Sequence, residues 1–182
     1  MPDIQNKPLL ILDLDETLVH AVDAALATPH DFIAGPFLVY KRPFLDDFIR
    51  TVAGGFQLAV WSSSSSDYVA AITTQIIPYN VSLEFEWSRT RCVQRYHPEW
   101  QGMYWVKDLK KVKRLGYNLN RMLMVDDTPS KLERNYGNAV YVSSFEGDPA
   151  DQELKQLGPY LMSLVDVQDF RTIEKRGWRS KV

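Results

Sequence analysis

The sequence is poor in the residue types that build disulfide frameworks, zinc sites and membrane spans. Its single cysteine, Cys92, excludes an internal disulfide and a cysteine-based zinc cluster. Its three histidines, His20, His30 and His97, have no metal-ligand spacing. No apolar run approaches the length needed to cross a bilayer, and residues 1–6 lack the basic and apolar regions of a signal peptide. We therefore expect a cytoplasmic protein with no membrane partner and no disulfide-linked partner.

Charge and composition are compatible with either a globular enzyme or a globular binding domain. The formal net charge of −2 gives no argument for a nucleic acid or an anionic membrane as a partner. Hydrophobic residues make up 45% of the chain, which is too many for a disordered protein. A length of 182 residues suits one domain with a substantial core. We expect a single domain over residues 1–182, with a core over about 8–165 and a helical tail over about 166–182.

Apolar runs alternate with helical patterns along the chain. Four runs are typical of strands buried on both faces of a sheet: residues 9–12, 56–61, 121–125 and 139–142. Helical patterns lie between or after them, at about residues 43–52, 67–77, 109–115 and after Pro149. This alternation predicts an α/β fold, with a mainly parallel sheet flanked by helices.

Residues 83–106 break this alternation. They begin with alternating apolar and polar residues and continue with recurring aromatic ones, which predicts a strand followed by a small antiparallel hairpin insertion. The stretch between Thr17 and Lys41 is mostly irregular and too short for a large cap domain. The stretch between Ser66 and Lys107 is filled by the predicted helix, strand and hairpin. We therefore expect no large cap domain and a site that is open to solvent.

Polar side chains follow three of the predicted strands where each strand ends. They are Asp13 and Asp15, Ser62 and Ser63, and Asp126 and Asp127. A lysine, Lys107, lies just before a predicted helix. The carboxyl ends of parallel strands meet at one edge of a sheet, which is where open α/β sheets bind ligands. We therefore expect these groups to converge.

The residue types suit phosphoryl transfer through a covalent aspartyl phosphate. A carboxylate that attacks phosphorus must overcome the repulsion between two anions, so a hard cation such as Mg²⁺ has to bridge them. We expect Asp13 to be the nucleophile, and Asp15 to protonate the leaving oxygen and then to activate water. We expect Mg²⁺ to bind Asp13, a backbone carbonyl near Asp15, and either Asp126 or Asp127.

The remaining polar groups suit phosphate binding. The Lys107 ammonium and the Ser62 hydroxyl are predicted to hold the phosphoryl oxygens, where charge develops during the reaction. Thr17 and Ser63 are further candidates for this role, because they lie next to the same predicted strand ends. Helix N-termini that follow Ser66 and Lys107 add affinity for anions.

Four segments together resemble the motifs of the haloacid dehalogenase superfamily: residues 13–20, 61–64, 106–109 and 125–129. More narrowly, they resemble the branch that contains the small C-terminal-domain phosphatases of RNA polymerase II. Residues 41–43 and 89–92 also fall where that family has similar residues. The resemblance covers roughly residues 8–165. It implies a Rossmann-like fold and Mg²⁺-dependent hydrolysis of phosphoserine or phosphothreonine in a protein or peptide, with Asp13 as nucleophile. It also suggests Arg89 as a phosphopeptide contact.

The sequence departs from this family at two of the motifs. The fourth motif has Asp126 and Asp127 where Asp-Asn is common, so the direct metal ligand stays open between the two. Ser62 stands where threonine is common, a change that keeps the hydroxyl. The segment before residues 41–43 is also shorter than in the eukaryotic enzymes. These departures concern the substrate and not the chemistry.

Two other functions fit the same residues. A phosphatase of a small metabolite, or of a nucleic-acid phosphate end, uses the same kind of centre. A non-catalytic protein-binding module is the second alternative, since relatives in mitochondrial import resemble this fold. Against that module argues the presence of the catalytic set, which comprises Asp13, Asp15, Lys107 and the pair Asp126 and Asp127.

Overall fold

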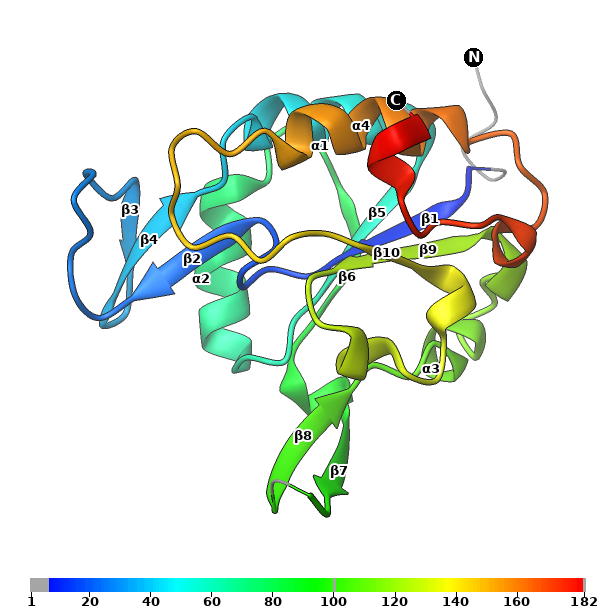
Figure 1. Cartoon of the computed structure of the whole chain (residues 1–182), viewed down its shortest axis with the longest axis horizontal. Coiled ribbons are helices and arrows are strands. Elements are labelled where there is room, and N and C mark those ends of the chain that lie inside the picture. The colour runs from blue at the N-terminus through cyan, green and yellow to red at the C-terminus, as the bar shows by residue number, and fades with distance from the viewer. Residues whose placement is uncertain (1–6, 100, 182) are drawn as a thin grey trace.

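The computed structural model describes residues 7–99 and 101–181. Its centre is a five-stranded sheet in the order β10–β9–β1–β5–β6 (Figure 1). These strands are β1 (Leu9–Leu12), β5 (Gln57–Trp61), β6 (Leu83–Trp87), β9 (Met122–Asp126) and β10 (Ala139–Tyr141). Every pairing within this sheet is parallel, which confirms the predicted α/β class.

Helices cover both faces of the sheet. One face packs against α1 (Leu45–Gly55), α2 (Ser66–Ile76) and α4 (Glu153–Ser163). The other face packs against the short α3 (Lys110–Lys113) and the 3-10 helix η4 (Pro129–Leu132). Because side chains alternate along a strand, β1 contributes to both cores and is buried throughout. The first predicted apolar run is therefore the central strand of the molecule.

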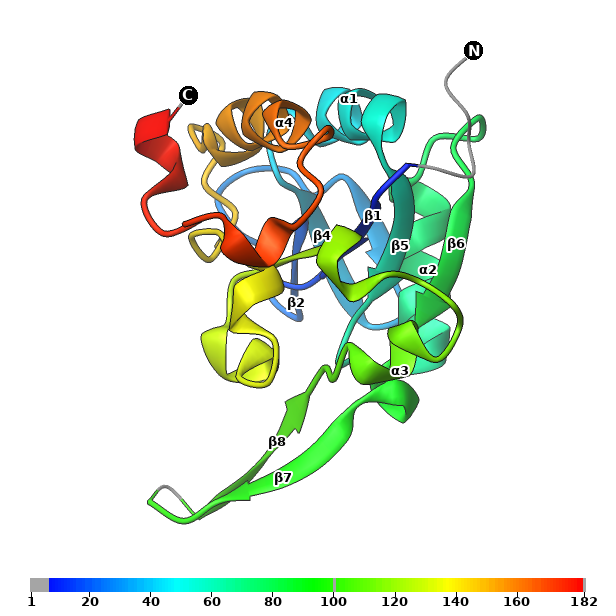
Figure 2. The same cartoon turned by 90° about the vertical axis from the view of Figure 1, so that its right-hand side faces the viewer.

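Two small antiparallel sheets extend from this body. One has the order β2–β4–β3 and consists of β2 (Val19–Val22), β3 (Phe32–Ala34) and β4 (Phe37–Lys41). The other is the hairpin of β7 (Val93–His97) and β8 (Gly102–Val106), which confirms the predicted insertion. Figures 1 and 2 both show this hairpin projecting away from the central sheet.

The sequence pattern missed β2 and β3 and placed an irregular stretch there. Both strands are short: β2 is a four-residue segment interrupted by His20, and β3 has only three residues. They are held by pairing with β4 on its two sides, with Val19 opposite Lys41 and Phe32 opposite Val39. This pairing is a long-range property that periodicity within one short segment does not report.

The C-terminal segment packs back onto the body. It forms the 3-10 helices η6 (Phe170–Thr172) and η7 (Trp178–Lys181). The side chains of Phe170 and Trp178 are buried in the core shared with α1 and α4, and the Trp178 indole donates a hydrogen bond to the Tyr141 carbonyl oxygen at 2.8 Å. The division into a core over about 8–165 and a tail over 166–182 stays a prediction.

Candidate active site

The strand register brings the predicted residues to one edge of the sheet. Leu12, the last residue of β1, lies opposite Val60 of β5 and Val125 of β9. Asp13 and Asp126 follow directly on neighbouring strands, and the Asp13 N–H donates to the Val125 carbonyl oxygen at 3.0 Å. The pairing of β1 with β9 therefore fixes the backbone positions of Asp13 and Asp126.

A tight turn directly after Asp13 contains Asp15. Glu16 has a φ of 59°, in the left-handed region that residues other than glycine seldom adopt. The Leu18 N–H donates to the Leu14 carbonyl oxygen at 2.8 Å and closes the turn. As a result the Asp13 and Asp15 side chains make contacts with different groups.

Asp13 and Asp126 share one buried lysine. Lys107 Nζ lies 2.7 Å from Asp13 Oδ1 and 2.7 Å from Asp126 Oδ2. All three side chains are essentially inaccessible to solvent. Buried charges are stable only when they are paired, so these three groups form one electrostatic unit.

A second lysine, which the sequence motifs did not predict, completes the cluster. Lys131 Nζ lies 2.9 Å from Asp13 Oδ2 and 3.6 Å from both Asp126 Oδ1 and Asp127 Oδ1. Lys131 is four residues after Asp127 and lies on η4, just after the fourth motif. That short spacing was the available signal, although a lone lysine after a motif is usually a surface residue.

The pKa values in this cluster follow from burial and charge together. Burial works to raise the pKa of Asp13, but Lys107 and Lys131 outweigh it and hold that pKa below its usual value. Burial, together with the Asp13 charge, raises the pKa of Asp126 to about 6. Burial works to lower the pKa of Lys131, yet Asp13 and Asp126 outweigh it and raise that pKa. Asp13 is therefore the more acidic carboxylate of the pair and is held ionised, as a nucleophile has to be.

Asp15 lies apart from the lysines and contacts hydroxyl groups. Its Oδ2 accepts hydrogen bonds from the Ser62 hydroxyl at 3.2 Å and the Ser64 hydroxyl at 2.9 Å. Its Oδ1 accepts a hydrogen bond from the Tyr68 hydroxyl at 2.5 Å. Burial, and then the charge of Asp15, raise the pKa of Tyr68, so its phenol stays a donor. Tyr68 lies on α2, and the sequence analysis did not single it out.

The predicted phosphate-binding residues line the same edge. Thr17 and Ser62 are both buried, and the Ser62 hydroxyl oxygen also accepts a hydrogen bond from the Ser64 N–H at 3.0 Å. The Thr17 hydroxyl has no hydrogen-bond partner within the described part of the chain. The Ser63 carbonyl oxygen accepts a hydrogen bond from Arg89 Nε at 2.6 Å. The structure brings these residues together, and their role in phosphate binding stays a prediction.

An open hollow of about 250 Å³ lies beside Asp15. It is lined by Asp15, Ala21, Phe37, Ser64, Ser65, Tyr68 and Arg89. The Arg89 side chain is exposed, and its guanidinium lies 5.5 Å from the centre of the Trp105 ring, at the base of the hairpin. A substrate group larger than phosphate has room here, next to the predicted acid/base residue.

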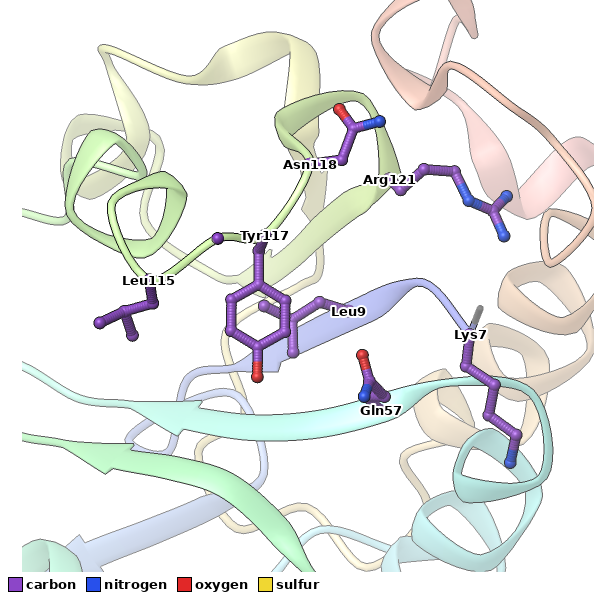
Figure 3. A pocket seen from close by; sticks show the side chains of 8 residues that line it. Lys7, Leu9, Gln57, Leu115, Tyr117, Asn118 and Arg121 are labelled. Carbon is purple, nitrogen blue, oxygen red and sulfur yellow. The ribbon is translucent and has the colours of Figure 1, made fainter. Parts of the chain in front are cut away.

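A larger hollow lies at the opposite edge of the sheet (Figure 3). Its volume is about 480 Å³, and it lies beside Leu9 and Gln57, the first residues of β1 and β5. Its two cationic side chains are bound to backbone carbonyl oxygens, Lys7 to Ala53 and Arg121 to Val165. Size alone therefore does not locate the reactive groups, which cluster at the carboxyl edge.

The donor set at the carboxyl edge fits a divalent cation. Asp13, Asp126 and Asp127 each offer one carboxylate oxygen, and these oxygens all lie within 4.8 Å of one another. Carboxylate oxygens are the ligands that Mg²⁺ prefers, and the Lys131 ammonium already shows that a cation is favoured among them. The Asp15 carboxylate is outside this group, so its expected part in metal binding rests on its backbone carbonyl.

The sequence of the chain matches a known protein family. The family described as NLI interacting factor-like phosphatase matches residues 8–171. The chain belongs to this family. The predicted resemblance to the haloacid dehalogenase phosphatases is thereby confirmed, and so is the expected enzyme class, a phosphoric monoester hydrolase domain.

Individual relatives agree with the family assignment. The chain is 34% identical over 177 residues to the probable C-terminal domain small phosphatase of Dictyostelium discoideum, covering 90% of this chain and 53% of that one. It is 32% identical over 188 residues to the CTD nuclear envelope phosphatase 1 homolog of Drosophila melanogaster, covering 95% and 73%. The chain therefore spans only about half of the Dictyostelium relative.

The fold is shared with a solved phosphatase structure. The structure of Fcp1, described as an essential RNA polymerase II CTD phosphatase, superposes with a TM-score of 0.60 at 15% identity. The match covers 92% of this chain and 52% of that one. At this identity the likeness shows a common fold.

The expected cytoplasmic location is wrong. Several similar relatives are named nuclear envelope phosphatases, which conflicts with that expectation. The expectation was a default drawn from the single cysteine and from missing membrane and targeting signals, and such missing signals do not identify the compartment to which a folded domain is directed. Over residues 7–99 and 101–181, no helix combines the length and apolar character that a bilayer crossing requires.

Proposed function

We propose that this chain is a Mg²⁺-dependent phosphatase that hydrolyses phosphoserine or phosphothreonine in proteins through a covalent aspartyl phosphate on Asp13. The observation that carries the proposal is the state of Asp13. This carboxylate is buried at the carboxyl edge of the sheet and is held ionised by Lys107 and Lys131. A carboxylate prepared in this way suits nucleophilic attack on phosphorus.

The reaction takes place in two steps. An oxygen of Asp13 attacks phosphorus, the bond from phosphorus to the substrate oxygen breaks, and Asp15 gives its proton to that leaving oxygen. Asp15 then takes a proton from water, the water oxygen attacks phosphorus, and the bond to Asp13 breaks to release phosphate. Bound among Asp13, Asp126 and Asp127, Mg²⁺ would offset the repulsion between the carboxylate and the phosphoryl oxygens.

Other side chains hold the phosphoryl group during both steps. The Lys107 ammonium lies 2.7 Å from Asp13, close enough to stabilise negative charge on an oxygen bound there. The Ser62 hydroxyl and the backbone N–H groups after β5 supply further donors at the same edge. Removal of any one of these donors is expected to slow the chemical step.

The openness of the site supports a protein substrate. The hollow beside Asp15 is open to solvent, and the segments at which a cap could be inserted fold as the small β2–β4–β3 sheet and as α2, β6 and the hairpin. A phosphorylated side chain on an extended segment can therefore enter the hollow beside Asp15. The names of the relatives, CTD small phosphatase and CTD nuclear envelope phosphatase, agree with a phosphoprotein substrate.

A substrate panel tests this proposal. We expect hydrolysis of an aryl phosphate that requires Mg²⁺ and stops with EDTA, and faster turnover of phosphoserine peptides than of sugar phosphates or nucleotides. Asp13→Asn should abolish turnover while circular dichroism shows the fold retained. Preference for a sugar phosphate or nucleotide would overturn the substrate class, and turnover by Asp13→Asn would overturn the mechanism. A wild type with no hydrolysis of any ester would indicate the binding module.

A further inference from the structure

Lys131 contacts every carboxylate of the predicted metal site. Its ammonium lies 2.9 Å from Asp13 and 3.6 Å from both Asp126 and Asp127, whereas Lys107 pairs with only the first two. Within the described residues, Lys131 is the lysine at the centre of the three-carboxylate group. Lys131 helps to hold Asp13 ionised, but it takes no part in either step of the proposed reaction.

The ammonium and a bound cation need the same space. The three ligand oxygens lie within 4.8 Å of one another, and Mg²⁺ binds oxygen at about 2.1 Å. A divalent ion that contacts all three oxygens therefore lies among them, where the Lys131 ammonium makes its contacts. Two cations cannot share that position, because they overlap and repel each other.

The backbone of Lys131 is fixed, but its side chain has a way out. Its N–H donates to the Thr128 carbonyl oxygen at 3.1 Å, and its carbonyl oxygen accepts from the Lys107 N–H at 2.8 Å. The Lys131 side chain is 18% exposed, whereas that of Lys107 is 0% exposed. A flexible four-carbon stem lets the ammonium move to solvent while the main chain stays in place.

We propose that Lys131 is a tethered cation that competes with the divalent metal for Asp13, Asp126 and Asp127. Without metal, its ammonium neutralises the cluster and keeps the three carboxylates together. When a divalent ion binds, the Lys131 side chain leaves the cluster for solvent. The metal affinity of this chain is therefore set by the exchange of one cation for another. The proposal rests on the proposed Mg²⁺-dependent function.

Metal binding to the full chain tests the competition without measuring activity. The dissociation constant for Mn²⁺ alone is measured by electron paramagnetic resonance for the wild type, for Lys131→Met and for Lys113→Met. Lys113 is an exposed lysine on α3, so its variant controls for the loss of one positive charge. We expect Lys131→Met to bind Mn²⁺ at least tenfold more tightly than the wild type and Lys113→Met to match the wild type. An unchanged or weaker affinity of Lys131→Met would overturn the proposal.

A second measurement uses the wild type and so does not depend on the folding of a variant. The rate of lysine acetylation is followed by mass spectrometry with and without saturating Mg²⁺. Displacement of the ammonium predicts that Lys131 is acetylated several-fold faster with Mg²⁺, while Lys107 stays protected. Equal or slower acetylation of Lys131 would count against displacement. The wild type could be an active phosphatase while Lys131→Met binds Mn²⁺ no more tightly and Mg²⁺ does not speed the acetylation of Lys131. That result would overturn the competition and leave the proposed function standing.

Discussion

The Tyr68 hydroxyl donates a hydrogen bond to Asp15 Oδ1 at 2.5 Å, and this contact links α2 to the predicted acid/base residue. The Tyr68 ring also packs edge-on against Phe37 of β4, with the ring centres 5.8 Å apart. The Tyr68 ring therefore has a structural role, and its hydroxyl contacts the predicted acid/base residue. A single substitution can remove the hydroxyl and keep the ring.

We expect Tyr68→Phe to lower kcat about tenfold and to change KM less. The change removes one hydrogen bond to a charged group, a loss of about 1.5 kcal/mol, while the ring keeps its contact with Phe37. Steady-state kinetics on an aryl phosphate measure the split between kcat and KM. The matched control is Tyr79→Phe, because Tyr79 is fully exposed. An equal kcat for both variants would show that the Tyr68 hydroxyl does not contribute to catalysis.

Lys107 is expected to be essential for stability as well as for chemistry. Lys107→Met removes the nearer of the two ammonium groups that pair with buried Asp126 and leaves only Lys131 at 3.6 Å, a change that costs about 3–5 kcal/mol and lowers Tm by about 10 °C. Thermal unfolding in EDTA measures the loss. The control is Lys111→Met, since Lys111 binds backbone carbonyl oxygens at the surface and its loss is expected to cost far less. Equal Tm values for the two variants would show that the pairs of Lys107 add no net stability.

The stability of Lys107→Met should depend on pH in a defined direction. The pKa of Asp126 is already raised to about 6 in the wild type, and loss of Lys107 raises it further. A carboxyl whose pKa is raised in the folded state takes up a proton more readily there than in the unfolded state, so folding is favoured as pH falls. We expect the difference in free energy of unfolding between wild type and Lys107→Met, measured by urea denaturation, to become smaller from pH 7 to pH 5. A difference that stays constant would mean that Asp126 does not become protonated.

The sequence predicted the site residues that follow strands, and it missed those whose position depends on tertiary packing. Asp13 and Asp126 could be predicted because each lies at the end of an apolar run that forms a strand. Lys131 could not be predicted, because its approach to Asp13 depends on the turn at η4 and on the register between β1 and β9. Tyr68 reaches Asp15 only because α2 packs on one face of the central sheet. Such approaches between distant segments leave no periodic signal in the chain.

The pair of Arg42 and Asp151 is another contact of this kind. Arg42 is buried, and its Nε and Nη2 donate to the two Asp151 oxygens at 3.0 and 2.8 Å, while Nη1 donates to the Thr17 carbonyl oxygen at 3.0 Å. The partners are 109 residues apart in the sequence. Arg42 therefore ties the start of α4 to the backbone beside the predicted phosphate-binding residue Thr17.

We expect Asp151→Asn to destabilise the protein by about 2 kcal/mol at pH 7, the scale of a hydrogen bond to a charged group. Burial works to raise the pKa of Asp151, but the Arg42 and Glu153 N–H hydrogen bonds outweigh it and lower that pKa. A carboxyl with a lowered pKa in the folded state adds stability that is present above its ordinary pKa and is lost as pH falls. The difference from wild type should therefore shrink below about pH 4 in urea denaturation. Asp46→Asn, which removes only an exposed pair with Lys41, should stay within about 0.5 kcal/mol of wild type.

Arg89 is expected to contact the substrate beyond its phosphate. Its side chain lines the hollow beside Asp15, is exposed and is held by the Ser63 carbonyl oxygen. Arg89→Ala should raise KM for a phosphoserine peptide at least fivefold and leave KM for an aryl phosphate within about twofold, because a small ester does not reach this side chain. Arg91→Ala is the matched control: Arg91 belongs to the same 3-10 helix, but its guanidinium lies over Trp87, 5.1 Å from the ring centre. An equal rise in KM for both esters would place Arg89 at the phosphate itself, and no rise for either would remove it from substrate binding.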